Sequence, residues 1–208
     1  MKRPMIVRIV VGIVVLVFVV GTWITSGTIE LGWLKYFSAA VFVATIALAL
    51  WDIWIWRWPT IQRIPGVTRC LQGTWKGMLT SFWIDPATGK RPQPKAVYLV
   101  VRQTATLIST KLVTDESRSK SSLADISTSD GSSELTYLYI DRPDARVEDH
   151  SRMHHGSTVL DISGTPARRL KGRYWTDRDS KGELDFGDRA KKLADDFEEA
   201  ESLFVGES

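Results

Sequence analysis

The first sixty residues are dominated by two long apolar runs. Residues 9–29 carry no charged side chain, and a second uncharged run covers residues 36–51. The first run matches the roughly 30 Å of hydrocarbon in a bilayer, and the second does so once it is extended to Trp56. The pattern predicts two transmembrane helices, over residues 6–27 and 35–56, that form a hairpin within a membrane domain spanning 1–58.

Basic residues lie near the start of the first predicted span and after the end of the second. The connector between the spans holds only Lys35 beside Glu30. Because basic residues remain in the cytoplasm, both termini of this multi-pass membrane protein are expected there. A secretory signal peptide is the alternative for the first run, but the run is long and no small-residue cleavage site precedes the second span. The flanking residues are Lys2, Arg3, Arg8, Arg57, Arg63 and Arg69.

Beyond a linker at 59–70, apolar and polar residues alternate with a period of two, which is typical of strands. Turn signals such as SDGSS at 129–133 and DSKG at 179–182 separate the alternating segments. No long amphipathic helix interrupts the series, so residues 71–187 are predicted to form an all-β domain, a small antiparallel meander barrel of about eight strands that is lipocalin-like. The expected strands are 71–84, 96–103, 104–114, 121–128, 134–141, 157–163, 169–178 and 182–186.

The last segment, 188–208, differs in charge and in periodicity. Leu193, Phe197, Ala200 and Phe204 recur at helical spacing, which predicts a short C-terminal helix. This tail holds 7 acidic and 3 basic residues, whereas 57–187 holds 15 acidic and 20 basic residues. The tail is expected to cap the barrel mouth, or else to accompany a mildly basic barrel that binds an anion. A net charge of only +3 argues against a protein that coats DNA or RNA.

Alternation also predicts which side chains face the barrel interior. In one strand Leu170, Gly172, Tyr174, Thr176 and Arg178 share a face. Such a mixture suits a pocket for a flat polar ligand, with rings for stacking and arginine for phosphate. Tyr and Thr are also good strand formers whose hydroxyls reach solvent at a rim, and the pattern leaves both interpretations open. The other inward sets are Val97, Leu99, Val101 and Gln103; Ser122, Ala124 and Ile126; and Leu135, Tyr137, Tyr139 and Asp141.

Motifs that carry catalysis are absent from the sequence. It has no Gly-x-Ser-x-Gly elbow, no His-Glu-x-x-His and no phosphate loop of the Walker type. His150, His154 and His155 do not suggest a metal site, because adjacent residues of a strand point to opposite faces. Asp52 is expected to be a wetted residue at the membrane interface. The chain is therefore predicted not to be an enzyme and to hold no metal or cofactor.

The order of several short segments after the hairpin resembles a known family. These segments are GTWKG at 73–77, STKLVTDESRSKSSLADI at 109–126, LTYLYIDRP at 135–143, HHGSTVLDIS at 154–163 and LKGRYWTDRDSKGEL at 170–184. Together with the two spans, they are similar to the two-transmembrane, strand-rich effectors of bacterial CBASS anti-phage systems, the S-2TMβ family. The resemblance covers essentially the whole chain.

The resemblance implies a cytoplasmic barrel that binds an activating cyclic dinucleotide made by a partner nucleotidyltransferase, with no direct contact to that enzyme required. Bound effectors would then self-associate through their hairpins and disrupt the inner membrane, which gives abortive infection. Ordering of the loop at 142–156 is one expected route from binding to assembly. The residues expected at the ligand are Tyr139, Tyr174, Thr176 and Arg178, with Trp75, Gln103, Thr110 and Ser122 as further candidates.

Two other functions compete with this prediction. A membrane-tethered, lipocalin-like carrier of a lipid or other apolar ligand shares the barrel, but it requires a broad apolar interior. A structural scaffold requires a barrel without a cavity, anchored by the hairpin. The interior of the barrel therefore distinguishes the three.

Overall fold

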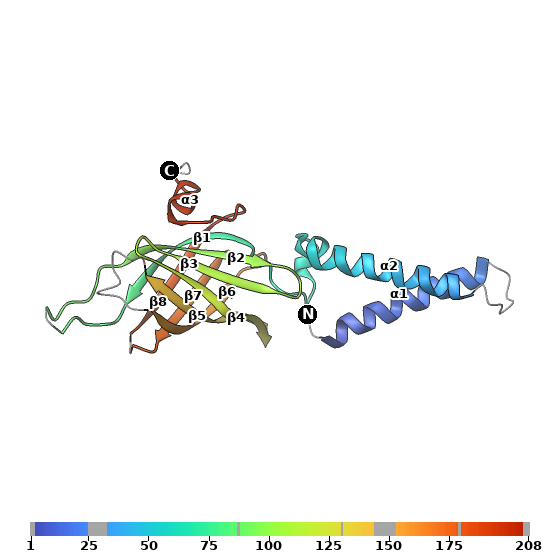
Figure 1. Cartoon of the computed structure of the whole chain (residues 1–208), viewed down its shortest axis with the longest axis horizontal. Helices are drawn as coiled ribbons and strands as arrows, with labels where there is room; N and C mark the ends of the chain where they lie inside the picture. The colour runs from blue at the N-terminus through green and yellow to red at the C-terminus, as the bar shows by residue number, and fades with distance from the viewer. Residues whose placement is uncertain are drawn as a thin grey trace. The chain divides into compact units, whose positions relative to one another are not determined.

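The computed structural model describes residues 3–24, 33–86, 88–129, 131–143, 153–178 and 180–205. The chain forms two compact units, which are considered one at a time (Figure 1). The first contains Met1–Val67 together with Thr104–Thr106. The second contains Thr68–Gln103 and Leu107–Ser208.

The first unit is helical. Helix α1 spans Arg3–Ile24 and α2 spans Trp33–Ile53, and the two lie side by side, followed by the short 3-10 turns η1 (Ile55–Arg57) and η2 (Ile61–Arg63) (Figure 1). Within the described residues, one helical segment, Ser38–Arg57, is long and apolar enough to cross a membrane; Val11–Gly21 is a shorter apolar stretch. One span is thus supported, and the second stays a prediction. Asp52 accepts hydrogen bonds from the Thr106 N–H (2.9 Å) and hydroxyl (2.8 Å) in the same unit.

The second unit is a closed barrel in which every strand pairs with its neighbours in sequence and β1 pairs with β8. All pairs are antiparallel, which confirms the predicted eight-stranded meander. The strands are β1 (Gly73–Ser81), β2 (Lys95–Gln103), β3 (Ile108–Val113), β4 (Ser117–Ser129), β5 (Ser132–Pro143), β6 (His154–Ser163), β7 (Arg169–Thr176) and β8 (Lys181–Ala190).

Alternation along the strands builds the barrel core as expected. In β7, Leu170 and Tyr174 are buried in the main cluster, whereas Lys171 and Arg173 point to solvent. Successive residues of a strand face opposite sides, so one apolar set per strand is enough to fill a small barrel. The largest fully buried side chains of the barrel core include Trp75, Phe186, Leu71, Leu99, Leu135, Leu160, Leu170 and Leu184.

Strand β4 departs from the expected pattern in two ways. It begins at Ser117, before the predicted start at Ser121, and its register with β5 shifts between Ser121 and Leu123. A bulge of this kind adds one residue to one strand and turns the side chains around it. Ser122 is consequently exposed, and it does not share the inward face of Ala124 and Ile126, which pack against the core.

The acidic tail lies on the barrel's outer wall. Helix α3 (Phe197–Ser202) and Phe204 cover Tyr98, whose ring centroid is 5.4 Å from that of Phe197 and 5.9 Å from that of Phe204. Tyr98 points outward from β2 with Val100, and this apolar patch needs a cover. The expectation that the tail caps the mouth is therefore wrong.

Candidate functional site

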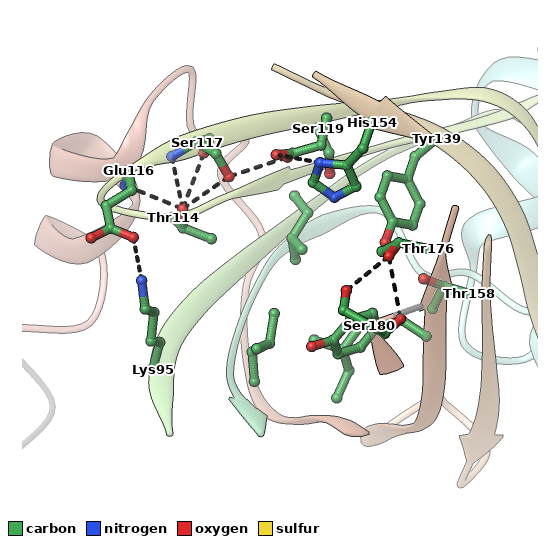
Figure 2. A pocket seen from close by; sticks show the side chains of 15 residues that line it. Lys95, Thr114, Glu116, Ser117, Ser119, Tyr139, His154, Thr158, Thr176 and Ser180 are labelled. Atoms are coloured by element: carbon green, nitrogen blue, oxygen red, sulfur yellow. Dashed lines mark hydrogen bonds and ion pairs between the residues drawn. The ribbon is translucent and has the colours of Figure 1, made fainter. Parts of the chain in front are cut away.

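A cavity of about 260 Å³ opens at the end of the barrel where β1, β3, β5 and β7 end and β2, β4, β6 and β8 begin (Figure 2). Its apolar wall consists of leucines, and hydroxyl, carboxyl and imidazole groups line the rest. We call this space the mouth cavity. It is lined by Leu79, Lys95, Leu112, Thr114, Glu116, Ser117, Ser119, Tyr139, Asp141, His154, Thr158, Tyr174, Thr176, Ser180 and Leu184.

Two tyrosines of the mouth cavity each lie against a glycine on the neighbouring strand. Tyr139 of β5 is paired with Gly156 of β6, and Tyr174 of β7 is paired with Gly182 of β8. A Cβ atom on Gly156 would lie 2.3 Å from Cζ of Tyr139, and one on Gly182 would lie 2.6 Å from Cε1 of Tyr174. The absent side chains thus provide the space in which the aromatic rings lie.

Asp141 is a buried carboxyl at the edge of the same cavity. Ser117 Oγ donates a hydrogen bond to its Oδ1 (3.1 Å), and His154 Nδ1 lies 3.8 Å from its Oδ2. Burial raises the pKa of Asp141, and this rise is partly offset by His154, by the Ser117 hydrogen bond and by the charge of Arg178. Polar neighbours hold the Asp141 carboxyl group, yet its burial makes the ionised form less favourable than it would be in water.

This raised pKa predicts a pH dependence of stability. A folded-state pKa above the unfolded one means that the folded barrel binds more protons, so Asp141 contributes stability that is lost as the pH rises through its folded pKa. Asp141→Asn is expected to remove that decline and to flatten the melting temperature against pH from 4 upward. Asp161→Asn, at an exposed position, serves as the control. An unchanged slope in Asp141→Asn contradicts the assignment.

Two buried hydroxyls, of Tyr137 and Thr158, face each other across β5 and β6 near the two tyrosines. Burial raises the pKa of Tyr137 to about 12, and its interaction with the Thr158 hydroxyl partly offsets that rise. Thr176 and Ser180 bond to each other through their hydroxyls at 2.8 Å (Figure 2). The hydroxyls of Thr158, Thr176 and Ser180 that line the cavity can donate and accept hydrogen bonds, which suits an occupant with polar groups.

The structure divides the predicted ligand residues into four groups. Tyr139, Tyr174 and Thr176 line the mouth cavity. Arg178 follows β7, is exposed and is not among the residues that line the mouth cavity, so the expectation that it shares the inward face of Leu170 and Tyr174 is wrong. Its charge nevertheless acts on the carboxyl of Asp141.

Trp75 and Gln103 do not line the mouth cavity. Trp75 is fully buried and its indole N–H donates to the Leu71 carbonyl at 2.8 Å. The Gln103 amide accepts from the Leu71 N–H (2.7 Å) and donates to the Arg69 carbonyl (2.8 Å). Both side chains thus tie the segment before β1 to the barrel.

Thr110 and Ser122 line a groove on the wall formed by β2 to β5.

Sequence reasoning missed Asp141, His154, Ser117, Thr158 and Ser180 as members of the mouth cavity. Strand alternation places Asp141 on the inward face and puts His154 on the same face as Thr158. This alternation is the sequence signal from which Asp141 and His154 could have been predicted.

Several expectations fall on segments outside the described residues. His150 and most of the loop at 142–156 belong to these segments. Among the residues that the structure describes, no group of three His, Cys, Asp or Glu side chains is arranged to hold a metal ion.

Comparison with known proteins identifies the barrel's family. Residues 68–187 match the family described as Cap15, cyclic dinucleotide receptor domain. The chain belongs to the Cap15 family. It is also similar to CD-NTase-associated protein 15 of Staphylococcus schleiferi, with 28% identity over 164 residues that cover 79% of this chain and 82% of that protein.

Membership of the Cap15 family confirms the predicted CBASS effector with a cyclic dinucleotide receptor domain. Cap15 proteins are non-enzymatic membrane effectors, which also confirms the expectation that the chain is not an enzyme. With a volume of about 260 Å³, the mouth cavity is smaller than the broad apolar interior that a lipid carrier requires.

Proposed function

We propose that the mouth cavity is the place where this Cap15 chain binds its cyclic dinucleotide. The observation that carries the proposal is the pair of tyrosines, Tyr139 and Tyr174, each positioned over a glycine at the edge of one cavity. Aromatic rings stack on nucleobases, which contributes about 1–3 kcal/mol per base. A cyclic dinucleotide has two bases, so each tyrosine ring would stack on one of them.

Polar groups around the rings would complete the site. The Asp141 carboxylate is an acceptor for base N–H groups, and Thr176 and Thr158 offer hydroxyls to the ribose or phosphate. Arg178 would neutralise a phosphate. The cavity volume of about 260 Å³ is below the usual range for ligand pockets, so the ligand would project beyond the mouth, where it remains accessible to a second protein copy.

The rest of the proposed mechanism concerns the membrane. The two spans at 6–27 and 35–56, with both termini and the barrel in the cytoplasm, would hold the receptor at the inner membrane. A ligand drives assembly only if it binds the assembled form more tightly than the resting form. A cyclic dinucleotide from a nucleotidyltransferase would thereby trigger self-association of hairpins, membrane disruption and abortive infection.

A thermal-shift panel of cyclic dinucleotides on the full chain in detergent micelles tests the site. A ligand that binds the folded state raises the melting temperature by mass action. We expect a selective rise that Tyr139→Ala abolishes and that Tyr139→Phe, which keeps the ring, preserves. Arg178→Ala should also abolish the response while leaving the melting temperature without ligand almost unchanged.

Two outcomes would contradict the proposal. A full response in both Tyr139→Ala and Arg178→Ala would place the nucleotide elsewhere on the barrel. Unfolding of Arg178→Ala without ligand would make Arg178 a structural residue.

A further inference from the structure

The outer wall of the barrel carries a second, strongly basic groove. It has a volume of about 900 Å³ and crosses β2, β3, β4 and β5. The described residues that line it include five cations and no carboxylate: Arg102, Lys111, Arg118, Lys120 and Arg142. We call it the basic groove.

The register of the strands places side chains of like charge directly opposite each other in the basic groove. Lys111 of β3 is the direct partner of Lys120 of β4, and Arg118 of β4 is the direct partner of Arg142 of β5. Like charges directly opposite each other destabilise a sheet. The seam that bears this repulsion is also short, because β3 and β4 pair over only three residue pairs, Lys111 to Val113 with Arg118 to Lys120.

The opposite side of the barrel shows how the same fold handles exposed cations. On β7 and β8, Arg169 Nε bonds to Asp185 at 2.7 Å and Lys171 Nζ lies 2.6 Å from Glu183. In the described part of the basic groove, Arg118, Lys120 and Arg142 have no such acidic partner. Arg118, Lys120 and Arg142 therefore leave positive charge on this wall that no acidic side chain of the described residues balances.

The chain's own tail supports an attraction for anions at the edge of the basic groove. Arg102 Nη2 lies 3.0 Å from an oxygen of the Asp195 carboxylate, and Lys111 Nζ donates to the Asp195 carbonyl. The cations at this edge of the groove thus already hold a carboxylate and a carbonyl oxygen of the same chain.

We propose that the basic groove binds the phosphate headgroups of anionic lipids at the membrane surface. The chain is a membrane effector, and fewer than twenty residues join the apolar segment ending at Arg57 to β1. This tether keeps the bilayer surface available at high effective concentration. Each Lys or Arg near an anionic membrane surface adds to the attraction, so the groove favours lipid over dilute soluble anions. The inference does not depend on nucleotide binding in the mouth cavity.

Hydrogen exchange of the full chain in nanodiscs tests the inference. Discs of phosphatidylcholine alone are compared with discs that also contain phosphatidylglycerol. Headgroups in the groove relieve the repulsion across the β3–β4 seam, so local opening becomes rarer. We expect amides of 108–120 to exchange about tenfold or more slowly in the anionic discs, and high salt to abolish the difference.

Two triple variants sharpen the test. Arg118→Gln with Lys120→Gln and Arg142→Gln should lose the lipid-dependent protection. Arg168→Gln with Lys171→Gln and Arg173→Gln, which removes three exposed cations from the β7 side of the barrel, should keep it. Equal protection in both triple variants, or none in the unaltered chain, overturns the proposal.

Two soluble anions added to phosphatidylcholine discs separate the lipid from other sources of phosphate. Protection by millimolar inorganic phosphate would mean a soluble-anion site and overturn the lipid assignment. Protection by a cyclic dinucleotide that the first triple variant abolishes would make the groove the nucleotide site, which overturns both this inference and the proposed role of the mouth cavity. Nucleotide binding that survives in that variant leaves the mouth cavity unaffected.

Discussion

Trp75→Ala is expected to lower the free energy of unfolding of the barrel by about 3–5 kcal/mol. Trp75 is fully buried, its indole N–H donates to the Leu71 carbonyl at 2.8 Å, and the Arg189 guanidinium lies 5.2 Å from the ring centroid. Truncation would leave a cavity, an unpaired carbonyl and an arginine without its aromatic neighbour. Chemical denaturation followed by near-ultraviolet circular dichroism measures the loss.

Trp83→Ala is the matched control for this substitution. The Trp83 side chain is 43% exposed, so its removal is expected to cost less than about 1 kcal/mol. A Trp75→Ala variant that is as stable as Trp83→Ala would contradict the structural role of Trp75. Ligand affinity of the Trp75→Ala variant, measured where it is still folded, then decides whether the indole also contributes to binding.

Gly156→Ala should weaken cyclic dinucleotide binding by about 10- to 100-fold while the barrel stays folded, because a lost stacking contact is worth about 1–3 kcal/mol. The new Cβ would lie 2.3 Å from Cζ and the hydroxyl oxygen of Tyr139, and these atoms are at the far end of a side chain that can rotate away. The backbone therefore remains in place and the ring leaves the cavity. Isothermal titration calorimetry on the full chain in micelles measures the affinity.

Gly187→Ala is the control for Gly156→Ala, because a Cβ at that position meets no atom within 4 Å. The double variant Gly156→Ala with Tyr139→Ala adds a second check. Since both changes remove the same ring from the cavity, the double variant should bind no more weakly than Tyr139→Ala alone. Additive losses would mean that Gly156 acts on the ligand by another route.

Much of the barrel could be predicted because its strands are local patterns. The alternation around Leu99 and Tyr174 reports which side of a strand is buried, and turn residues separate one strand from the next. The start of β4 was missed because Ser117 to Ser121 contains no apolar residue to mark the alternation. The bulge at Ser122 was missed because a bulge depends on the partner strand.

The candidate site was less predictable because it depends on contacts between distant strands. Alternation assigned Tyr139, Tyr174 and Thr176 to the interior, but it could not tell which end of the barrel each would reach. The basic groove was not predicted at all. The charges of Lys111 and Lys120 are visible in the sequence, yet their direct opposition exists only through the register between β3 and β4.

Closure of the barrel by pairing of β1 with β8 has a consequence during translation. The first strand leaves the ribosome long before its partner at 181–190 has been synthesised, and no earlier strand can replace that partner in this meander. Helices form from local contacts, so α1 and α2 are complete well before the receptor is. A nascent or prematurely terminated chain can therefore reach the membrane, but it cannot sense its signal until the last strand is made.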